Sequence, residues 1–303
     1  MRRTIVPQHV TRVLATIGAA LGFSICLRAS EVSVADELRV MQCQVDLSVA
    51  DGEVVVDRIR TGQVPSERLF ALLKHLTALR SLSLHVRAEE GDRTCLQRIG
   101  SLGSLRELSL AGDGVNDEVM TWIGCLTNLQ QLSLWRVSVG SLGLSQLRRL
   151  QLLKRFDFST FETINRLGAQ GIARLLALEE VRIAGPCEAG ALSVLATLPN
   201  LRAICLSGVN INGTLSDLNS VLTIERVEIS MSAVDLTTTR ELAGMKNLSF
   251  LKLECCNITQ EAVPGLASLA LQEFECTFAE PERLGELARA LSRNPYRTLR
   301  VLR

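Results

Sequence analysis

The sequence predicts an α/β solenoid, in which a short β-strand and a short return path alternate along most of the chain. The apolar spacing L-x-x-L-x-L occurs at residues 105–110 and again at residues 129–134. Between these stretches, apolar residues at helical spacing lie within residues 119–126. One strand with one return helix cannot bury its own apolar face, so it needs a similar unit on each side.

The second observation is a nearly constant period. The same spacing begins ten times, at intervals of 23 to 28 residues. The starting residues are Leu79, Leu105, Leu129, Leu153, Leu178, Leu201, Ile224, Leu248, Leu271 and Leu299. A single match means little in a leucine-rich chain, but ten at this period predict one continuous parallel sheet from about residue 79 to residue 302.

The repeat that begins at Leu248 matches a known consensus at every fixed position. Residues 248–258, LSFLKLECCNI, fit L-x-x-L-x-L-x-x-N/C-x-L, with Cys256 at the Asn/Cys place. Over residues 44–303 the chain therefore resembles the leucine-rich repeat family. The resemblance implies a curved horseshoe with a parallel sheet on its concave side and short helices or turns on its convex side.

The chain departs from that family pattern at the Asn/Cys place of its other repeats. That place is held by Asp113, Val137, Phe161, Pro186, Val209, Ser232 and Ala279. We therefore expect no continuous ladder of side-chain amides at this corner, and its backbone groups need other partners.

The expected domain layout places a cap before the repeats. Two β-rich runs around Asp51-Gly52, a tight-turn signal, predict a hairpin within a cap over residues 36–78. Repeats follow over residues 79–280, and a helix with a last strand at a charged sheet edge is expected over residues 281–303. With an export signal in front, this layout resembles leucine-rich repeat proteins exported by planctomycete-type bacteria.

Residues 1–35 have the composition of a signal peptide. A basic start precedes an apolar, uncharged stretch at residues 13–27, which is short for a bilayer span of about 20 residues. Small residues at Ser33 and Ala35 place the expected cleavage after Ala35. We expect export to a periplasm, cell envelope or external medium, with an uncleaved membrane anchor as the alternative.

Composition argues against nucleic acid as a partner. The formal charge is +1, and removal of residues 1–35 leaves 29 basic and 31 acidic residues. Such a balance does not attract a polyanion by bulk electrostatics. The apolar content of 47% with only 4% aromatic residues fits a core of Leu, Ile and Val in one elongated domain.

Local signals predict where the return helices begin and where they are weakest. Asn116 precedes acids in a first turn, so it is expected to cap a helix. Thr259 is a similar start, which Pro264 should confine or shift. The repeat near residues 210–220 should have the loosest convex side, and residues 282–292 should be helical before a strand at residues 298–302.

The nine cysteines follow no fixed spacing along the chain, so most are expected to be small buried hydrophobic residues. Cys256 and Cys276 occupy adjacent repeats and form the one pair worth testing for a disulfide. No Cys/His spacing indicates a metal site, and no cofactor is expected. The chain has three histidines and no hydrolase, zinc-protease or phosphate-loop motif, so we expect no enzyme.

Binding is expected on the concave sheet, where the third, fifth and seventh places of each repeat point outward. The candidate binding residues are His85, Trp135, Arg155, Asp157, Arg182, Arg226, Phe250 and Lys252. Trp135 lies between small neighbours and is a candidate anchor, because hot spots favour Trp and Arg. The charges alternate in sign between strands, which predicts the pairs Arg155–Glu180, Asp157–Arg182 and Glu228–Lys252, with Glu275 also beside Lys252. A surface lattice that only satisfies itself is the alternative for these charges.

Two functions remain open at this point. The first is a non-catalytic scaffold that binds another protein or a peptide on the concave face. The second is a structural or envelope-associated element that self-assembles or holds glycan. Carbohydrate sites usually need several aromatic platforms, and this face offers only Trp135 and Phe250. The oligomeric state is open.

Overall fold

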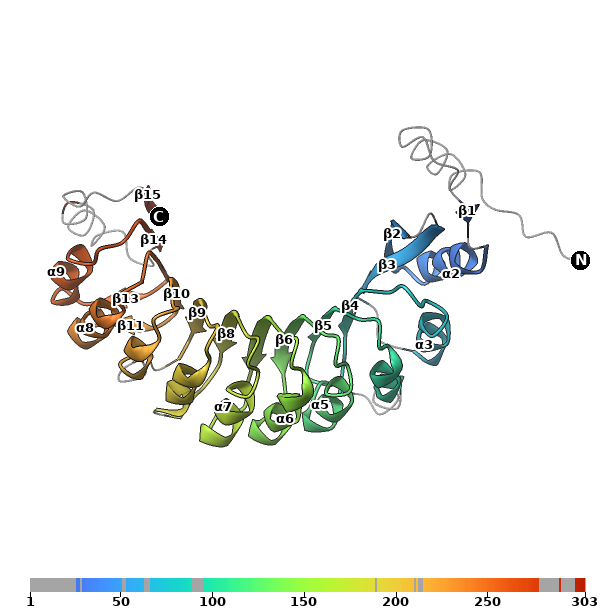
Figure 1. Cartoon of the computed structure of the whole chain (residues 1–303), viewed down its shortest axis with the longest axis horizontal. Helices are drawn as coiled ribbons and strands as arrows, with labels where there is room; N and C mark the ends of the chain where they lie inside the picture. The colour runs from blue at the N-terminus through green and yellow to red at the C-terminus, as the bar shows by residue number, and fades with distance from the viewer. Residues whose placement is uncertain are drawn as a thin grey trace, which may run out of the picture.

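The structure, a computed structural model, is a curved solenoid whose sheet lines the concave side and whose helices lie on the convex side (Figure 1). The residues that it describes are 26–27, 29–50, 53–62, 66–88, 95–188, 190–209, 211, 215–277, 289 and 298–302. The expected curved horseshoe is confirmed.

Thirteen strands of the described part form one sheet, in the order β1-β3-β4-β5-β6-β7-β8-β9-β10-β12-β14-β15, with β2 paired to β3. The strands are β1 Cys26–Leu27, β2 Gln44–Ala50, β3 Glu53–Thr61, β4 Ser81–His85, β5 Glu107–Ala111, β6 Gln131–Val137, β7 Arg155–Thr160, β8 Glu180–Ala184, β9 Ala203–Ser207, β10 Arg226–Ser230, β12 Phe250–Glu254, β14 Glu273–Thr277 and β15 Thr298–Leu302. All pairs from β3 to β15 are parallel, so the predicted continuous parallel sheet is confirmed.

The return paths are short helices. They are α3 Glu67–Leu73, η1 Gln97–Ser101, α5 Asp117–Ile123, α6 Ser141–Ser145, η2 Gln146–Arg149, α7 Arg166–Ile172, η3 Ala191–Thr197, η4 Asp217–Ser220, α8 Leu236–Gly244 and α9 Ala262–Ala267. A further two-stranded ladder joins β11 Ala233–Val234 to β13 Asn257–Ile258 on the convex side. No helix among the described residues is both long and apolar enough to pass through a bilayer.

The cap hairpin is as expected. β2 and β3 are antiparallel, with a register shift between Asp46 and Leu47, and β3 then pairs in parallel with β4. The hairpin therefore extends the sheet of the repeats and covers the N-terminal end of their core. A helix, α2 Ala29–Val40, packs beside this hairpin.

Helix α2 runs across the expected signal-peptide junction. Ala35 is 1% exposed, and the Glu31 carboxylate accepts a hydrogen bond from the Val56 amide at 3.2 Å. Cleavage after Ala35 would remove the first seven residues of this helix, including that carboxylate.

The core is a row of side chains between sheet and helices. In each repeat the fourth and sixth places point inward, and both are almost fully buried from Leu82 and Leu84 to Phe274 and Cys276. On β7 these two inward places hold Phe156 and Phe158, whose rings stack with their centroids 5.6 Å apart. Neighbouring repeats thus bury what no single repeat could.

Side-chain caps start the helices where the residue type allows it. Asn116 accepts hydrogen bonds from the Glu118 and Val119 amides, as predicted. The helix expected from Thr259 is shifted, as predicted from Pro264: α9 begins at Ala262, and no side chain caps it. Pro264 lies within the first turn of α9, where a missing N–H costs nothing, and so sets that later start. Residues 210 and 212–214 lie outside the described part, and in the rest of residues 210–220 the convex side has one short 3₁₀ turn, η4.

Hydroxyl and thiol groups replace the missing amide ladder at the corner after the strands. Thr160 Oγ1 donates to the carbonyls of Val137 or Val139, and Ser232 Oγ to that of Val209. At the opposite edge, just before the strands, three asparagines bond to the preceding repeat. Their acceptors are Gly103 O for Asn128, Leu176 O for Asn200 and Leu222 O for Asn247.

Cys256 and Cys276 are free thiols, so the structure does not contain the disulfide considered for them. The Cys256 thiol instead donates to Ile229 O at 3.3 Å, at the corner place of the consensus. Burial raises the pKa of the Cys276 thiol to about 12. Of the cysteines described, Cys125 and Cys255 are exposed and do not fit the expected buried role.

The helix expected at residues 282–292 lies outside the described residues apart from Arg289, which is helical.

Candidate binding surface on the concave sheet

The structure places all eight candidate residues on the concave face of the sheet. Five of them are exposed, namely His85, Trp135, Arg155, Arg182 and Arg226. Asp157 and Lys252 are half-buried among their neighbours, and Phe250 is buried. The strand alternation therefore assigns the face correctly, but it does not give the accessibility of each side chain.

Trp135 keeps 39% of its surface exposed. Its neighbour on β5 is Ala111, which is too small to cover the indole. The register between β6 and β7 shifts between Leu134 and Val137, and Arg136 takes a left-handed conformation with φ 54°. Because this end of β6 is irregular, Trp135 lies exposed at the edge of the concave face.

Phe250 is not the aromatic platform that the sequence suggested. Its ring is only 9% exposed, and the Arg226 guanidinium lies 3.8 Å from the ring centroid. Such a contact between a cation and a π face is favourable, and the guanidinium covers the ring face on which a sugar or peptide would stack. Trp135 is then the aromatic side chain that remains open on the described concave face.

The predicted ion pairs are partly correct. Arg155 Nε lies 2.7 Å from Glu180 Oε2, as expected, and this hydrogen bond raises the pKa of the Arg155 guanidinium. The predicted Asp157–Arg182 pair was wrong, because Arg182 instead reaches Glu228 Oε2 at 3.7 Å.

The predicted Glu228–Lys252 pair was also wrong. Lys252 bonds Glu254 on its own strand at 2.8 Å, and this contact raises the pKa of the ammonium group. Glu228 is instead shared between Arg182 and Arg226, the latter at 3.4 Å.

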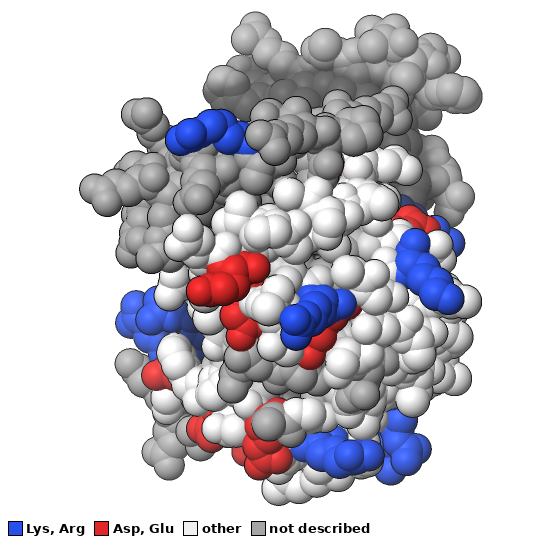
Figure 2. Space-filling model, turned by 90° about the vertical axis from the view of Figure 1, so that its left-hand side faces the viewer, with Lys and Arg blue, Asp and Glu red and all other residues white. Residues whose placement is uncertain are grey.

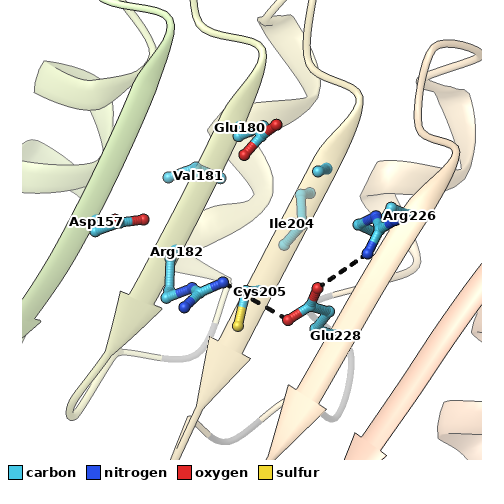
Figure 3. A pocket seen from close by; sticks show the side chains of 9 residues that line it. Asp157, Glu180, Val181, Arg182, Ile204, Cys205, Arg226 and Glu228 are labelled. Carbon is cyan, nitrogen blue, oxygen red and sulfur yellow. Dashed lines mark hydrogen bonds and ion pairs between the residues drawn. The ribbon is translucent and has the colours of Figure 1, made fainter. Parts of the chain in front are cut away.

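A shallow pocket of about 40 Å³ lies over β9, between the charged side chains of β8 and β10 (Figure 3). Its floor is built from Ala203 and Cys205, the small outward residues of β9. Figure 3 shows the Arg182–Glu228 pair passing over Cys205 and Glu228 turning toward Arg226. Arg182 can span β9 only because β9 presents no long side chain.

The Cys205 thiol on the floor of the pocket is held in its protonated form. Burial raises the pKa of the Cys205 thiol to about 11, with smaller opposing effects from Arg182 and Glu228, so the thiol is protonated at neutral pH. The strand alternation puts Ala203 and Cys205 on the outward face, but it does not indicate that two small outward residues on one strand form a pocket.

Asp157 lines the pocket on the side nearer to Trp135. Its Oδ2 accepts a hydrogen bond from Ser133 Oγ at 3.0 Å, and within the described residues no Lys or Arg forms an ion pair with it. It is one strand from Trp135 and two residues along, a separation of roughly 8 Å by sheet geometry. An apolar group and a carboxylate are thus available side by side.

His85 lies two strands from Trp135, beyond Ala111, and is not part of this group. Lys252 lies beyond the pocket, next to Glu254. At the C-terminal end of the solenoid, basic and acidic side chains are intermixed over the described surface (Figure 2). No trio of His, Cys, Asp or Glu side chains in the described ranges could hold a metal ion.

Searches for similar proteins give a fold and no sequence family. No family model matches the chain, and no characterised protein matches it in sequence. Among solved structures, the chain is similar to the internalin InlF from Listeria monocytogenes, with 16% identity and a TM-score of 0.54. The match covers 90% of this chain and 75% of that one.

Two receptor structures are similar over a smaller part of their length. TLR13 in complex with ssRNA13 is 19% identical with a TM-score of 0.48, over 77% of this chain and 34% of the receptor. The Arabidopsis receptor kinase HAESA ectodomain, in complex with a peptide hormone, is 17% identical with a TM-score of 0.43, over 76% and 44%. The chain thus spans less than half of either receptor structure.

Proposed function

Because the chain folds as a leucine-rich repeat solenoid, we propose that it is a non-catalytic scaffold that binds a protein or peptide segment on its concave sheet. The observation that carries this proposal is the adjacency of exposed Trp135 and Asp157, a carboxylate without an ion-pair partner among the described residues. The self-neutralised charges around them offer less binding energy, because exposed pairs contribute about 0–1 kcal/mol.

The ligand chemistry follows from these two groups. An apolar side chain of the partner packs against the Trp135 indole, and a basic side chain pairs with Asp157 in partly desolvated surroundings, where charge-assisted hydrogen bonds are strongest. The pocket over β9 lies three strands from Trp135, or about 14 Å at the usual strand spacing. An extended segment of about five residues laid across the strands covers that distance.

The test is capture of partners with immobilised full-length protein, followed by mass spectrometry. Trp135→Ala and Asp157→Asn should each lower recovery of the specific partner at least tenfold, as loss of a hot-spot contact usually does. The matched control is Phe161→Ala, because Phe161 is 63% exposed but lies beyond the end of β7. Equal recovery of the partner by Trp135→Ala and Phe161→Ala would show that the partner does not bind on the concave face.

We also propose that the protein is exported through residues 1–35. The support is the apolar stretch at residues 13–27 followed by small residues before Asp36. The mass of the protein recovered outside the cytoplasm should correspond to a chain that begins at Asp36. A mature chain that begins at or before Ala29 would instead keep the whole of α2 and the contact between Glu31 and Val56.

A further inference from the structure

The convex surface of two adjacent repeats differs in charge from the rest of the solenoid. The return segments 138–152 and 161–178 together contain four arginines and one acidic residue, Glu162, close to the end of β7. These arginines are Arg148, Arg149, Arg166 and Arg174, all exposed. The return segments on either side, 112–128 and 185–200, contain acids and no Lys or Arg.

None of the four arginines is neutralised within the part of the chain that the structure describes. The ion pairs there involve arginines and lysines of the cap, of helices α2, α3 and η1, and of the sheet and its strand edges, and none of these four arginines. Asp117, the acid nearest to α6, is already engaged, because its Oδ1 accepts a hydrogen bond from the Gly140 amide at 2.8 Å. The positive charge of α6, η2 and α7 therefore faces solvent.

Exposed leucines occupy the same surface. Leu142 is 66% exposed and Leu167 is 48% exposed, and each is the second residue of its helix. The two helices approach closely there, because a Cβ on Gly168 would lie 3.0 Å from Ser141 Cα. Leu142 and Leu167 thus project side by side from neighbouring helices.

A groove joins the two kinds of side chain. It has a volume of about 220 Å³ between α6–η2 and α7, and its lining includes Arg148, Arg174 and Leu167. Two guanidinium groups at a groove of this size match a phosphate, which accepts their hydrogen bonds in pairs. The adjacent leucines match a ligand whose apolar part lies directly next to that phosphate.

We propose that α6, η2 and α7 form a docking surface for an anionic lipid bilayer. Phospholipid headgroups bind between Arg148 and Arg174, and Leu142 and Leu167 enter the boundary between headgroups and acyl chains. These helices lie at the outermost part of the convex arc (Figure 1), where a flat surface touches a curved solenoid first. Docking there leaves the concave wall facing away from the bilayer.

Vesicle flotation tests the proposal. Full-length protein is mixed with vesicles of phosphatidylcholine alone or with 30 mol% phosphatidylglycerol. Arg148→Gln/Arg174→Gln should lower partition onto the anionic vesicles about ten- to thirtyfold, since each basic residue near such a surface contributes about a factor of five. The control is Arg106→Gln/Arg240→Gln, which removes the same charge from exposed positions elsewhere and should change partition less than twofold.

The control also removes a competing explanation. All variants retain the apolar residues 13–27, so attraction by that segment alone would affect the two pairs equally, and that result would overturn the proposal. Binding of inorganic phosphate in solution without flotation would overturn it too, by identifying a free anion as the ligand.

A second pair of variants tests the apolar part. Leu142→Ala/Leu167→Ala should reduce partition severalfold while thermal unfolding stays unchanged, because both side chains are exposed. The matched control is Leu222→Ala, which is 60% exposed outside this surface and should have no effect. Unchanged partition of the double variant would show a purely electrostatic contact and overturn the insertion of leucines.

Discussion

The concave wall has two halves that differ in the side chains they present. From β4 to β6 the fifth place of each repeat, which points outward, holds Ser83, Ser109 and Ser133. Long polar side chains are few on these strands. From β7 to β12 the same wall carries Arg, Asp, Glu and Lys, linked by ion pairs across and along the strands. Trp135 and Asp157 stand at the boundary between the serine half and the charged half.

The difference shows that a charged surface is not automatically a binding surface. In the charged half each cation has a nearby carboxylate, so a partner must compete with contacts that already exist. In the serine half Glu107 pairs with Arg58 of β3 at 3.1 Å, and few other long side chains are present there for a partner to contact. The boundary combines an open indole with a carboxylate that has no ion pair among the described residues, which is why binding is expected there.

The largest expected effect tests whether the halves share one core. Leu132 in the serine half and Phe156 in the charged half are register partners, and both are fully buried. Leu132→Ala should lower the free energy of unfolding by about 2–5 kcal/mol and Phe156→Ala by about 3–5 kcal/mol. Both should shift one common thermal transition in calorimetry. Two separate transitions would mean that the halves unfold independently.

The next effect concerns the corner after each strand. Gly112 follows β5 with φ 111°, and a Cβ there would lie 2.1 Å from Val86 O. Gly112→Ala should therefore destabilise the protein by about 1–3 kcal/mol in a urea titration. Gly103→Ala is the control, because no heavy atom lies within 4 Å of its Cβ position. A Gly112 variant as stable as the control would contradict the close approach of the two corners.

The charged half contains the opposite case. Met231 follows β10 in the left-handed region with φ 49°, and its side chain is 67% exposed. Met231→Gly should raise the free energy of unfolding by roughly 0.5–1 kcal/mol, because glycine adopts this conformation without strain. A loss of stability in the same urea titration would show that the exposed methionine makes contacts that outweigh the strain.

The repeat spacing was sufficient to predict the strands, their register and the face to which each outward residue belongs. It could not predict the Arg182–Glu228 pair, because that depends on how far a long side chain reaches over the small residues of β9. It also could not place Phe250 beneath Arg226, since both occupy outward positions by alternation alone. The corner partners Thr160 and Ser232 depend on backbone carbonyl directions, which the side-chain pattern does not contain.

The convex surface shows a different limit. The four arginines of residues 138–152 and 161–178 are plain in the sequence once the return segments are compared with one another. The outward places of the strands do not include them, because they lie in helices and turns, which do not follow the two-residue alternation of a strand. Which of these side chains are exposed and adjacent, as Leu142 and Leu167 are, depends on the close glycine contacts between α6 and α7.

The smallest effect probes the charge network directly through the Cys205 thiol. Its pKa is raised to about 11 mainly by burial, and the Glu228 carboxylate adds to the rise while Arg182 opposes it. Glu228→Gln should therefore lower this pKa, and Arg182→Gln should raise it further. Stability should change by less than about 1 kcal/mol in both, because the pair is partly exposed.

Alkylation of Cys205 by iodoacetamide, followed by peptide mass spectrometry, measures these shifts. Below the pKa the rate follows the thiolate fraction, so it should rise about tenfold per pH unit between pH 8 and pH 10. At any pH in that window Glu228→Gln should react faster than the parent protein and Arg182→Gln more slowly. Equal changes of the alkylation rate in the two variants would mean that the substitutions only change how easily the reagent reaches the pocket. Opposite changes require that both charges lie close to the sulfur, as the ion pair over β9 places them.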